Sequence, residues 1–299
     1  MPNNIEFYVP PNAEVIFVED FFVDEILGGA EMTSDAIIQA ADRRVCHLHS
    51  RSLTERLVKA HRAKKWVFGN QTQVPPWILN LLLELNIEYH FFEYDYKPCI
   101  YRSTKKHESI TGKPCDCTQS QHGQWMSYWM TGAKTLFWCS GKQRDKFYDE
   151  YPHLIGRTRD FVQGSTFYPD TIKKIRVVRE QNLPAQDHWC ILDSDSWIKG
   201  TSDAVDHCNQ NGMKFVLLKN LSNEDFLKQL SSSKGLVFFP RDIDVGSRIT
   251  VESKLLGREV ILNPNVLVQY EPWFSRSLEE IEEYFLDGPT RFWKTIHNS

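Results

Sequence analysis

Two successive series of alternating strand-like and helix-like runs constrain the fold of this chain more than any other feature of its sequence. The strand-like runs of the first series are 13–22, 43–50, 64–70 and 87–96, with further runs after 134. The helix-like runs between them are 28–41, 52–63 and 75–86. Strands that alternate with helices of this length are typical of βαβ units, which form a parallel sheet.

A second series follows a polar linker near 181–187. Its strand-like runs are 187–195, 213–218, 235–240 and 258–263, and a helix-like tail covers 277–296. A chain of 299 residues is also long for one hydrophobic core. We therefore expect an α/β fold of two Rossmann-like domains that face a crevice. The first domain is expected at 1–180, with a polar insertion at 97–124, and the second at 181–275.

Composition and charge exclude several classes of protein. The net charge of −4 does not fit a polyanion-binding domain, which would be strongly basic. Apolar runs long enough for a membrane helix do not occur, and residues 1–11 lack the pattern of an export signal, so we expect a cytoplasmic protein. The absence of G-x-G-x-x-G after the first strand of either series argues against a dinucleotide oxidoreductase.

The stretch FFPRDIDVGSRITVESKLLG, residues 238–257, places charged residues between a predicted strand and a predicted helix. Ligands of open α/β sheets bind beyond the carboxyl ends of the strands, where helix N-termini point into a crevice. Gly246 lets the backbone approach a ligand, and the N–H groups of Ser247 and Arg248 would hold a phosphate. Arg248 opposes the helix dipole unless an anion joins it. Glu252 lies further along, within reach of a ribose diol.

The spacing Asp244-x7-Glu252 resembles the Glu-x7-Glu donor-binding motif of retaining glycosyltransferases of the GT-B fold. The segment EILGGAE (25–31) resembles the glycine loop of this family, which implies that Gly28 and Gly29 approach the donor phosphates. SWIKG (196–200) resembles the segment whose lysine binds the diphosphate, here Lys199. EYDYK, CDC and VESKLLG are similar to stretches of bacterial and viral glycosyltransferase sequences.

The resemblance implies transfer of a sugar from a nucleotide-diphosphate donor, with retention of configuration, to a glycan, lipid-linked or nucleic-acid acceptor. It also implies that a C-terminal helix, at 276–299, packs back on the first domain. Asp244 replaces the usual Glu of the motif, which shortens its reach toward the sugar by one methylene. Asp95, at the end of its predicted strand, is the candidate for acceptor contact or general base.

The chemistry is expected to need no metal, because Lys199, Arg248 and the helix N-terminus would stabilise the leaving diphosphate. Two alternatives stay open. One is a nucleotide-sugar epimerase of the same fold, which would convert its donor without an acceptor. The other is a zinc-stabilised binding protein without enzymatic activity, whose affinity for nucleic acid would depend on salt.

Seven cysteines, an odd number, argue against a framework of disulfides. Cys99, His107, Cys115 and Cys117 lie within the polar insertion and offer the ligand types that tetrahedral zinc prefers. A structural zinc ion is one interpretation of this segment. The other is a set of reduced, partly buried thiols.

Overall fold

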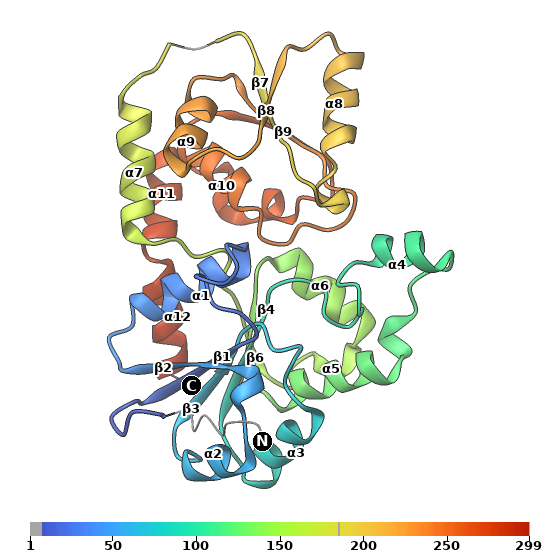
Figure 1. The fold of residues 1–299 in the computed structure, drawn as a ribbon, viewed down its shortest axis with the longest axis vertical. Helices are drawn as coiled ribbons and strands as arrows, with labels where there is room; N and C mark the ends of the chain where they lie inside the picture. The colour runs from blue at the N-terminus through green and yellow to red at the C-terminus, as the bar shows by residue number, and fades with distance from the viewer. Residues whose placement is uncertain (1–7, 185, 299) are drawn as a thin grey trace, which may run out of the picture.

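Two parallel sheets, one above the other in Figure 1, form the computed structural model of the chain, which describes residues 8–184 and 186–298. The first sheet has the order β2-β1-β3-β4-β5-β6, and the second has the order β10-β9-β7-β8. All strand pairs in both sheets are parallel. The expected α/β fold is thereby confirmed. The absence of an export signal was inferred from residues 1–11, of which residues 1–7 lie outside the described part of the chain.

The central strands of the first sheet are buried on both faces, and its edge strands are partly exposed. Its strands are β1 (Val15–Glu19), β2 (Val45–His49), β3 (Lys65–Phe68), β4 (Tyr89–Glu93), β5 (Thr135–Trp138) and β6 (Arg159–Val162). The helices connecting them are α1 (Gly29–Gln39), α2 (Glu55–Ala60), α3 (Pro76–Glu84), α4 (Thr104–Thr111), α5 (Gln121–Gly132) and α6 (Gly141–Glu150). Every residue of β1, β4 and β5 is buried. Strands covered on both faces read as continuous apolar runs, which is why these were recognisable in the sequence.

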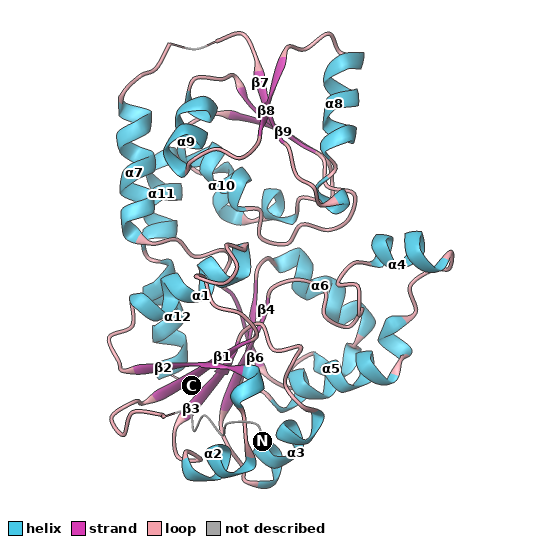
Figure 2. Cartoon of the chain, in the orientation of Figure 1, coloured by secondary structure: helices cyan, strands magenta, loops and turns pink. Residues whose placement is uncertain are grey.

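The second sheet has its own core. Its strands are β7 (Trp189–Leu192), β8 (Phe215–Leu218), β9 (Gly235–Phe238) and β10 (Glu259–Leu262). The helices of this part are α7 (Pro169–Glu180), α8 (Thr201–Gln210), α9 (Asn223–Ser231), α10 (Arg248–Leu255) and α11 (Leu278–Leu286). Apolar side chains of α7, α9, α10 and α11 form one cluster with the sheet, and α8 packs on the other face (Figure 2).

Helix α7 belongs to the second core, which differs from the division expected at residue 180. Its buried residues Ile172, Ile175 and Val178 pack in the same cluster as Leu227 of α9 and Leu255 of α10. The chain therefore crosses from the first sheet to the second within residues 163–168, before α7 rather than after it. An amphipathic helix carries no sequence signal for which of two neighbouring cores it joins, because its apolar stripe fits either.

The C-terminal tail forms two helices where one was expected. Helix α11 packs on α7 and α10 in the second half, and α12 (Gly288–His297) crosses back to the first half, where Figure 1 shows it in red beside α1. The break falls at Gly288-Pro289, since proline is accepted only in the first turn of a helix. Phe292 of α12 lies against Phe137 of β5, with ring centroids 4.5 Å apart.

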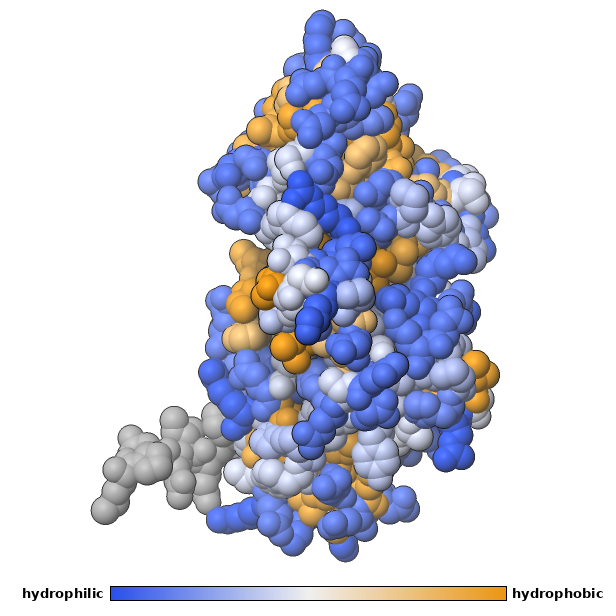
Figure 3. Space-filling model, turned by 90° about the vertical axis from the view of Figure 1, so that its right-hand side faces the viewer, coloured by the Kyte–Doolittle hydropathy of each residue, from blue (hydrophilic) through white to orange (hydrophobic). Residues whose placement is uncertain are grey.

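The two crossings of the chain lie side by side. Gln163, in the first crossing, donates a hydrogen bond from Nε2 to the main-chain oxygen of Gly288, in the second, at 2.8 Å. The face in Figure 3 is largely hydrophilic, with apolar side chains exposed near the level where the halves meet. Within the described residues, we find no helix with the length and apolar character needed to cross a membrane.

Candidate functional site

A cavity of about 310 Å³ lies between the two halves of the molecule. Its lining comes from both halves: Gly29, Ala30, Glu31, Thr33, Asn70, Tyr94, Asp95, Arg102, Cys139 and Ser165 from the first, and Lys199, Ile243, Asp244, Val245 and Gly246 from the second. Every lining residue follows the carboxyl end of a strand. Parallel sheets gather these ends at one edge, so the cavity occupies the position at which open α/β sheets bind ligands.

Of the glycines predicted to approach a ligand, Gly29 and Gly246 line the cavity and Gly28 lies outside its lining. Gly28 is the N-cap of α1, and a Cβ there would meet the Glu31 carboxylate at 2.2 Å. Gly29 lines the cavity, where a Cβ would meet the Arg248 side chain at 3.6 Å. At Gly246, a Cβ would meet Ser165 Oγ at 2.9 Å. The missing side chain at Gly246 therefore lets the two halves approach closely, whereas a Cβ at Gly29 would make only an ordinary van der Waals contact.

Lys199 and Asp244 form an ion pair in the cavity wall, with 2.7 Å between Nζ and Oδ2. The Asp244 carboxylate raises the pKa of Lys199, so the ammonium stays charged. Gly200 turns the chain directly after Lys199 with φ +64°, and a Cβ there would meet the Phe239 carbonyl oxygen at 1.9 Å. The sequence motifs assign Lys199 and Asp244 to different parts of a ligand. In the structure the two side chains contact each other, although they lie 45 residues apart in the chain.

Arg248 lies behind the cavity rather than in its lining. Its guanidinium stacks 3.9 Å from the Phe167 ring and donates to the Thr166 main-chain oxygen at 2.7 Å. The same Nη1 atom lies 3.4 Å from Oγ1 of Thr33, a lining residue. Nε and Nη2 are shielded from solvent and find no acceptor among the described residues. Buried donors without acceptors are rare, which makes this side chain notable.

Ser247 and Glu252 lie beside Arg248, one at the N-cap of α10 and the other one helical turn after Arg248. Ser247 is the buried N-cap residue, and its Oγ is 2.8 Å from Thr250 Oγ1. Glu252 is only 8% exposed, and no hydrogen bond to its carboxylate is found in the described part of the chain. Burial raises the pKa of Glu252 to about 7, although the Arg248 charge acts in the opposite direction. Neither Ser247 nor Glu252 reaches the cavity lining directly.

Asp95 faces the cavity from the end of β4. Arg102 Nη1 lies 3.3 Å from its Oδ2, while Oδ1 is buried and unpartnered among the described residues. Its neighbour Tyr94 shares a 2.6 Å hydrogen bond with Ser34 Oγ, and burial raises the pKa of Tyr94 well above its usual value. Burial also raises the pKa of Glu93, the last residue of β4, to about 7, so two carboxyl groups lie at this strand end.

Several lining residues were missed by sequence reasoning. Glu31 comes two residues after the predicted glycine pair and accepts a hydrogen bond from Asn70 Nδ2 at 3.2 Å, and Asn70 is the last residue of a predicted strand. Their positions after strand ends were a usable signal. Cys139 and Ser165 follow the ends of β5 and β6 and carried the same signal, whereas Arg102 lies well beyond the end of β4 and only the tertiary fold brings it to the cavity.

Comparison with known proteins supports the architecture. No protein-family model and no curated protein sequence matches the chain. Among solved structures, Anabaena HepE in complex with UDP is similar over 96% of this chain and 100% of its own, with 12% identity and a TM-score of 0.60. HepE with UDP and glucose covers 95% of this chain and 90% of its own, with 12% identity and a TM-score of 0.52.

An epimerase has a similar fold. UDP-GlcNAc 2-epimerase from Neisseria meningitidis, bound to UDP-GlcNAc, covers 95% of this chain and 100% of its own, with 9% identity and a TM-score of 0.51. At such identities the likeness concerns the fold alone. The chain therefore has the GT-B fold of the glycosyltransferases that its sequence motifs resemble, in which two Rossmann-like halves face one another across a cleft.

Proposed function

We propose that this protein transfers a sugar from a nucleotide-diphosphate donor to an acceptor. The observation that carries the proposal is the cavity at the strand ends of both sheets, with the Lys199–Asp244 pair on one wall and Asp95 opposite, on the other half. The similar HepE structures contain UDP, and UDP with glucose. In this proposal the second half holds the nucleotide sugar and the first half holds the acceptor.

The donor-side roles follow from charge and position. Lys199 carries a positive charge that would stabilise the leaving diphosphate, aided by the N–H groups of Gly246 and Ser247 at the start of α10. These charges make the proposed chemistry independent of a metal ion. Asp244 would then meet the sugar hydroxyls. Glu252, which lies outside the cavity lining in the ligand-free structure, would meet the ribose, because the ribose lies further along the helix than the phosphates.

The acceptor-side role falls to Asp95. Its Oδ1 atom, which is buried and without a partner among the described residues, would accept a proton or hydrogen bond from an acceptor hydroxyl, while Arg102 holds the other oxygen. The acceptor would be a glycan, a lipid-linked sugar or another hydroxyl compound, nucleic acid included. Retention of configuration is proposed on the resemblance of Asp244-x7-Glu252 to the motif of retaining enzymes.

A thermal-shift screen across nucleoside diphosphates and their sugars tests the proposal. A ligand that binds only the folded state raises stability with the logarithm of its saturation, by about 2.7 kcal/mol at 100 times Kd. We expect one nucleoside diphosphate, and its sugars, to raise Tm clearly above the others. Equal Tm values throughout the series at millimolar ligand would contradict a nucleotide-sugar site.

The second candidate is a nucleotide-sugar epimerase, because an epimerase has a similar fold with a TM-score above 0.5. The two activities differ in their need for an acceptor. An epimerase converts UDP-GlcNAc to its 2-epimer in a reaction with no second substrate, which proton NMR of the mixture would reveal. A glycosyltransferase leaves the sugar configuration of the free donor unchanged.

Arg248→Ala is expected to weaken binding of UDP far more than binding of uridine. The two shielded, unpartnered guanidinium nitrogens would meet a phosphate oxygen, and a hydrogen bond to a charged group contributes about 1.5–3 kcal/mol. The expected loss in UDP affinity is therefore about 10- to 100-fold. Isothermal titration calorimetry with both ligands measures it.

Arg241→Ala is the matched control, because Arg241 also stacks on an aromatic ring, 4.9 Å from Trp197, but its Nε and Nη2 donors are already paired with Asp203 and Ser202. Its affinity for UDP should equal that of the unmodified protein. If Arg248→Ala lowered the affinities for UDP and uridine equally, the guanidinium would not contact phosphate and the donor site would need to be redrawn.

A further inference from the structure

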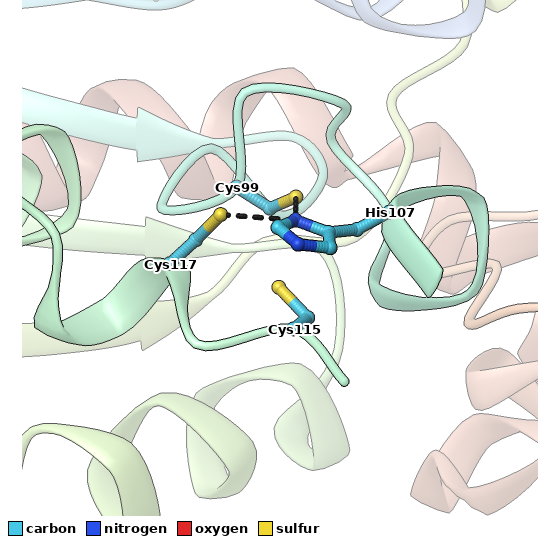
Figure 4. Close-up of side chains that lie close together, drawn as sticks. All are labelled: Cys99, His107, Cys115 and Cys117. Atoms are coloured by element: carbon cyan, nitrogen blue, oxygen red, sulfur yellow. Dashed lines mark hydrogen bonds between the residues drawn. The ribbon is translucent and has the colours of Figure 1, made fainter. Parts of the chain in front are cut away.

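Four side chains of the polar insertion meet at one point on the first half of the molecule. Figure 4 shows Cys99, His107, Cys115 and Cys117 directed toward one another. One ligand atom from each lies within 4.8 Å of the other three. His107 Nδ1 is 3.2 Å from Cys117 Sγ and 3.7 Å from Cys99 Sγ. All three cysteines are free of disulfides.

The two S···N distances are close to those of a tetrahedral zinc site. With Zn–S bonds of about 2.3 Å and a Zn–N bond of about 2.0–2.1 Å, a tetrahedron has S···N edges of about 3.5 Å and S···S edges of about 3.8 Å. The two measured S···N distances lie on either side of that edge. Three thiolates and one imidazole are a ligand set that structural zinc takes, and one that harder cations avoid.

The insertion also lacks an apolar core that would explain its order. Its two isoleucines, Ile100 and Ile110, are 64% and 54% exposed. Cys99 and Cys117 are instead among the side chains that the segment buries against the main core. A segment with so little buried apolar surface commonly depends on a metal ion or disulfides for its fold.

The local backbone is shaped around the cluster. Cys99 lies in the turn after β4, His107 on α4, and Cys115 and Cys117 just before α5. Gly123, in the first turn of α5, allows Cys117 to approach, since a Cβ there would meet the Cys117 carbonyl oxygen at 2.0 Å. The geometry therefore requires a glycine in α5 in order to hold this cysteine loop against the helix.

The cluster is connected to the other half of the molecule through the N-terminus of α4. Asp242, in the loop after β9, accepts hydrogen bonds from Ser103 Oγ at 2.6 Å and from the Lys105 main-chain N–H at 2.9 Å. Ser103 lies between two of the cluster residues in the chain, and Asp242 lies two residues before Asp244. The position of α4 thus bears on the loop that forms the cavity wall.

We propose that Cys99, His107, Cys115 and Cys117 bind one zinc ion, and that this ion fixes the end of α4 that holds Asp242. The three thiols release their protons to solvent as they bind, and the imidazole binds in its neutral form. The role is structural, because all four positions of the tetrahedron are filled by protein atoms. The proposal does not depend on the identity of the nucleotide sugar.

Metal analysis of the purified, reduced protein tests the site. We expect about one zinc per chain in the unmodified protein, and the same content in Cys46→Ser, a matched change at a buried thiol of β2 outside the cluster. Cys115→Ser should lower the content to below about one tenth. A zinc-free unmodified protein, prepared without chelator, would overturn the proposal, as would a disulfide between any two of the three cysteines.

If Cys115→Ser does not fold, cobalt substitution of the unmodified protein tests the Cys₃His site instead. Co²⁺ bound by thiolates in a tetrahedral site gives strong charge-transfer and visible absorption bands, and zinc should displace it with loss of those bands. A weak octahedral spectrum, or Co²⁺ that zinc does not displace, would contradict a Cys₃His site.

Hydrogen exchange of the amides tests the second part of the proposal, that the zinc ion fixes the contact between α4 and Asp242. Removal of zinc by a chelator should increase exchange at Lys105 and Lys106, whose N–H groups bond to Asp242 and to Ser103 Oγ. Exchange in α8, in the other half, serves as the internal control and should not change. If Lys105 and Lys106 keep their protection in zinc-free protein, the ion does not fix this contact.

Discussion

Lys199→Ala is expected to lower kcat about 100- to 1,000-fold, the range found when one group that stabilises developing negative charge is removed. Lys199 is the cationic side chain of the cavity lining on the second half, and its pairing with Asp244 keeps it charged. Without it, the leaving diphosphate loses its closest counter-charge and Asp244 loses its partner. The rate of UDP release from the UDP-sugar that stabilises the protein most measures the effect.

Lys219→Ala provides the matched control for this experiment. Lys219 belongs to the same half, is similarly exposed and pairs with Asp193 and Asp195, but it does not line the cavity. Its removal should leave kcat unchanged, because Lys219 lies outside the cavity and exposed ion pairs contribute little to the stability of the fold. Lys199→Arg, which keeps the charge, should recover part of the rate. A kcat for Lys199→Ala within threefold of the unmodified enzyme would remove Lys199 from the reaction.

Glu252→Gln is expected to stabilise the ligand-free protein at pH 8 and to leave its stability unchanged near pH 4.5. Burial raises the pKa of Glu252 from 4.5 to about 7. The folded state therefore binds more protons than the unfolded state in this window, and the free energy of unfolding falls as pH rises through it. A shift of about 2.5 pKa units corresponds to an effect on the order of 3 kcal/mol above pH 7.

Calorimetric Tm values of the ligand-free protein at the two pH values measure this effect. The matched control is Glu224→Gln, because Glu224 is an exposed helical residue whose pKa is lowered by Lys228. Its small effect should have the opposite sign. The same Glu252→Gln variant should bind uridine and UDP more weakly. Equal Tm differences at pH 8 and pH 4.5 would show that Glu252 is not a strained carboxyl group.

The order of strands and helices could be predicted because parallel strands covered on both faces are continuous apolar runs, as in β1, β4 and β9. The place of α7 could not, because its stripe of Ile172, Ile175 and Val178 is compatible with either core. The pair Gly288-Pro289 indicates a break between α11 and α12. The helical segments on either side, 9 and 10 residues long, nevertheless make the tail resemble one continuous helix.

In the candidate site, too, some residues could be predicted from the sequence and some contacts could not. Gly29, Asp95, Lys199, Asp244 and Gly246 follow strand ends, and the topology of parallel sheets alone brings such residues to one edge. The contact between Lys199 and Asp244 depends on how two loops of the second half pack, and the stacking of Arg248 on Phe167 depends on how the crossing segment folds. Side-chain contacts of this kind leave no periodic pattern or fixed spacing in the sequence from which they could be predicted.

The paired crossings between the halves have a mechanical consequence. Two adjacent covalent connections, joined by the Gln163–Gly288 hydrogen bond, define a line about which one half turns relative to the other without stretching either connection. Sliding and twisting of the halves would strain one connection against the other. Any opening of the cleft would therefore pivot at these two connections, and severing the chain ahead of α12 would leave residues 163–168 as the remaining covalent link between the described halves.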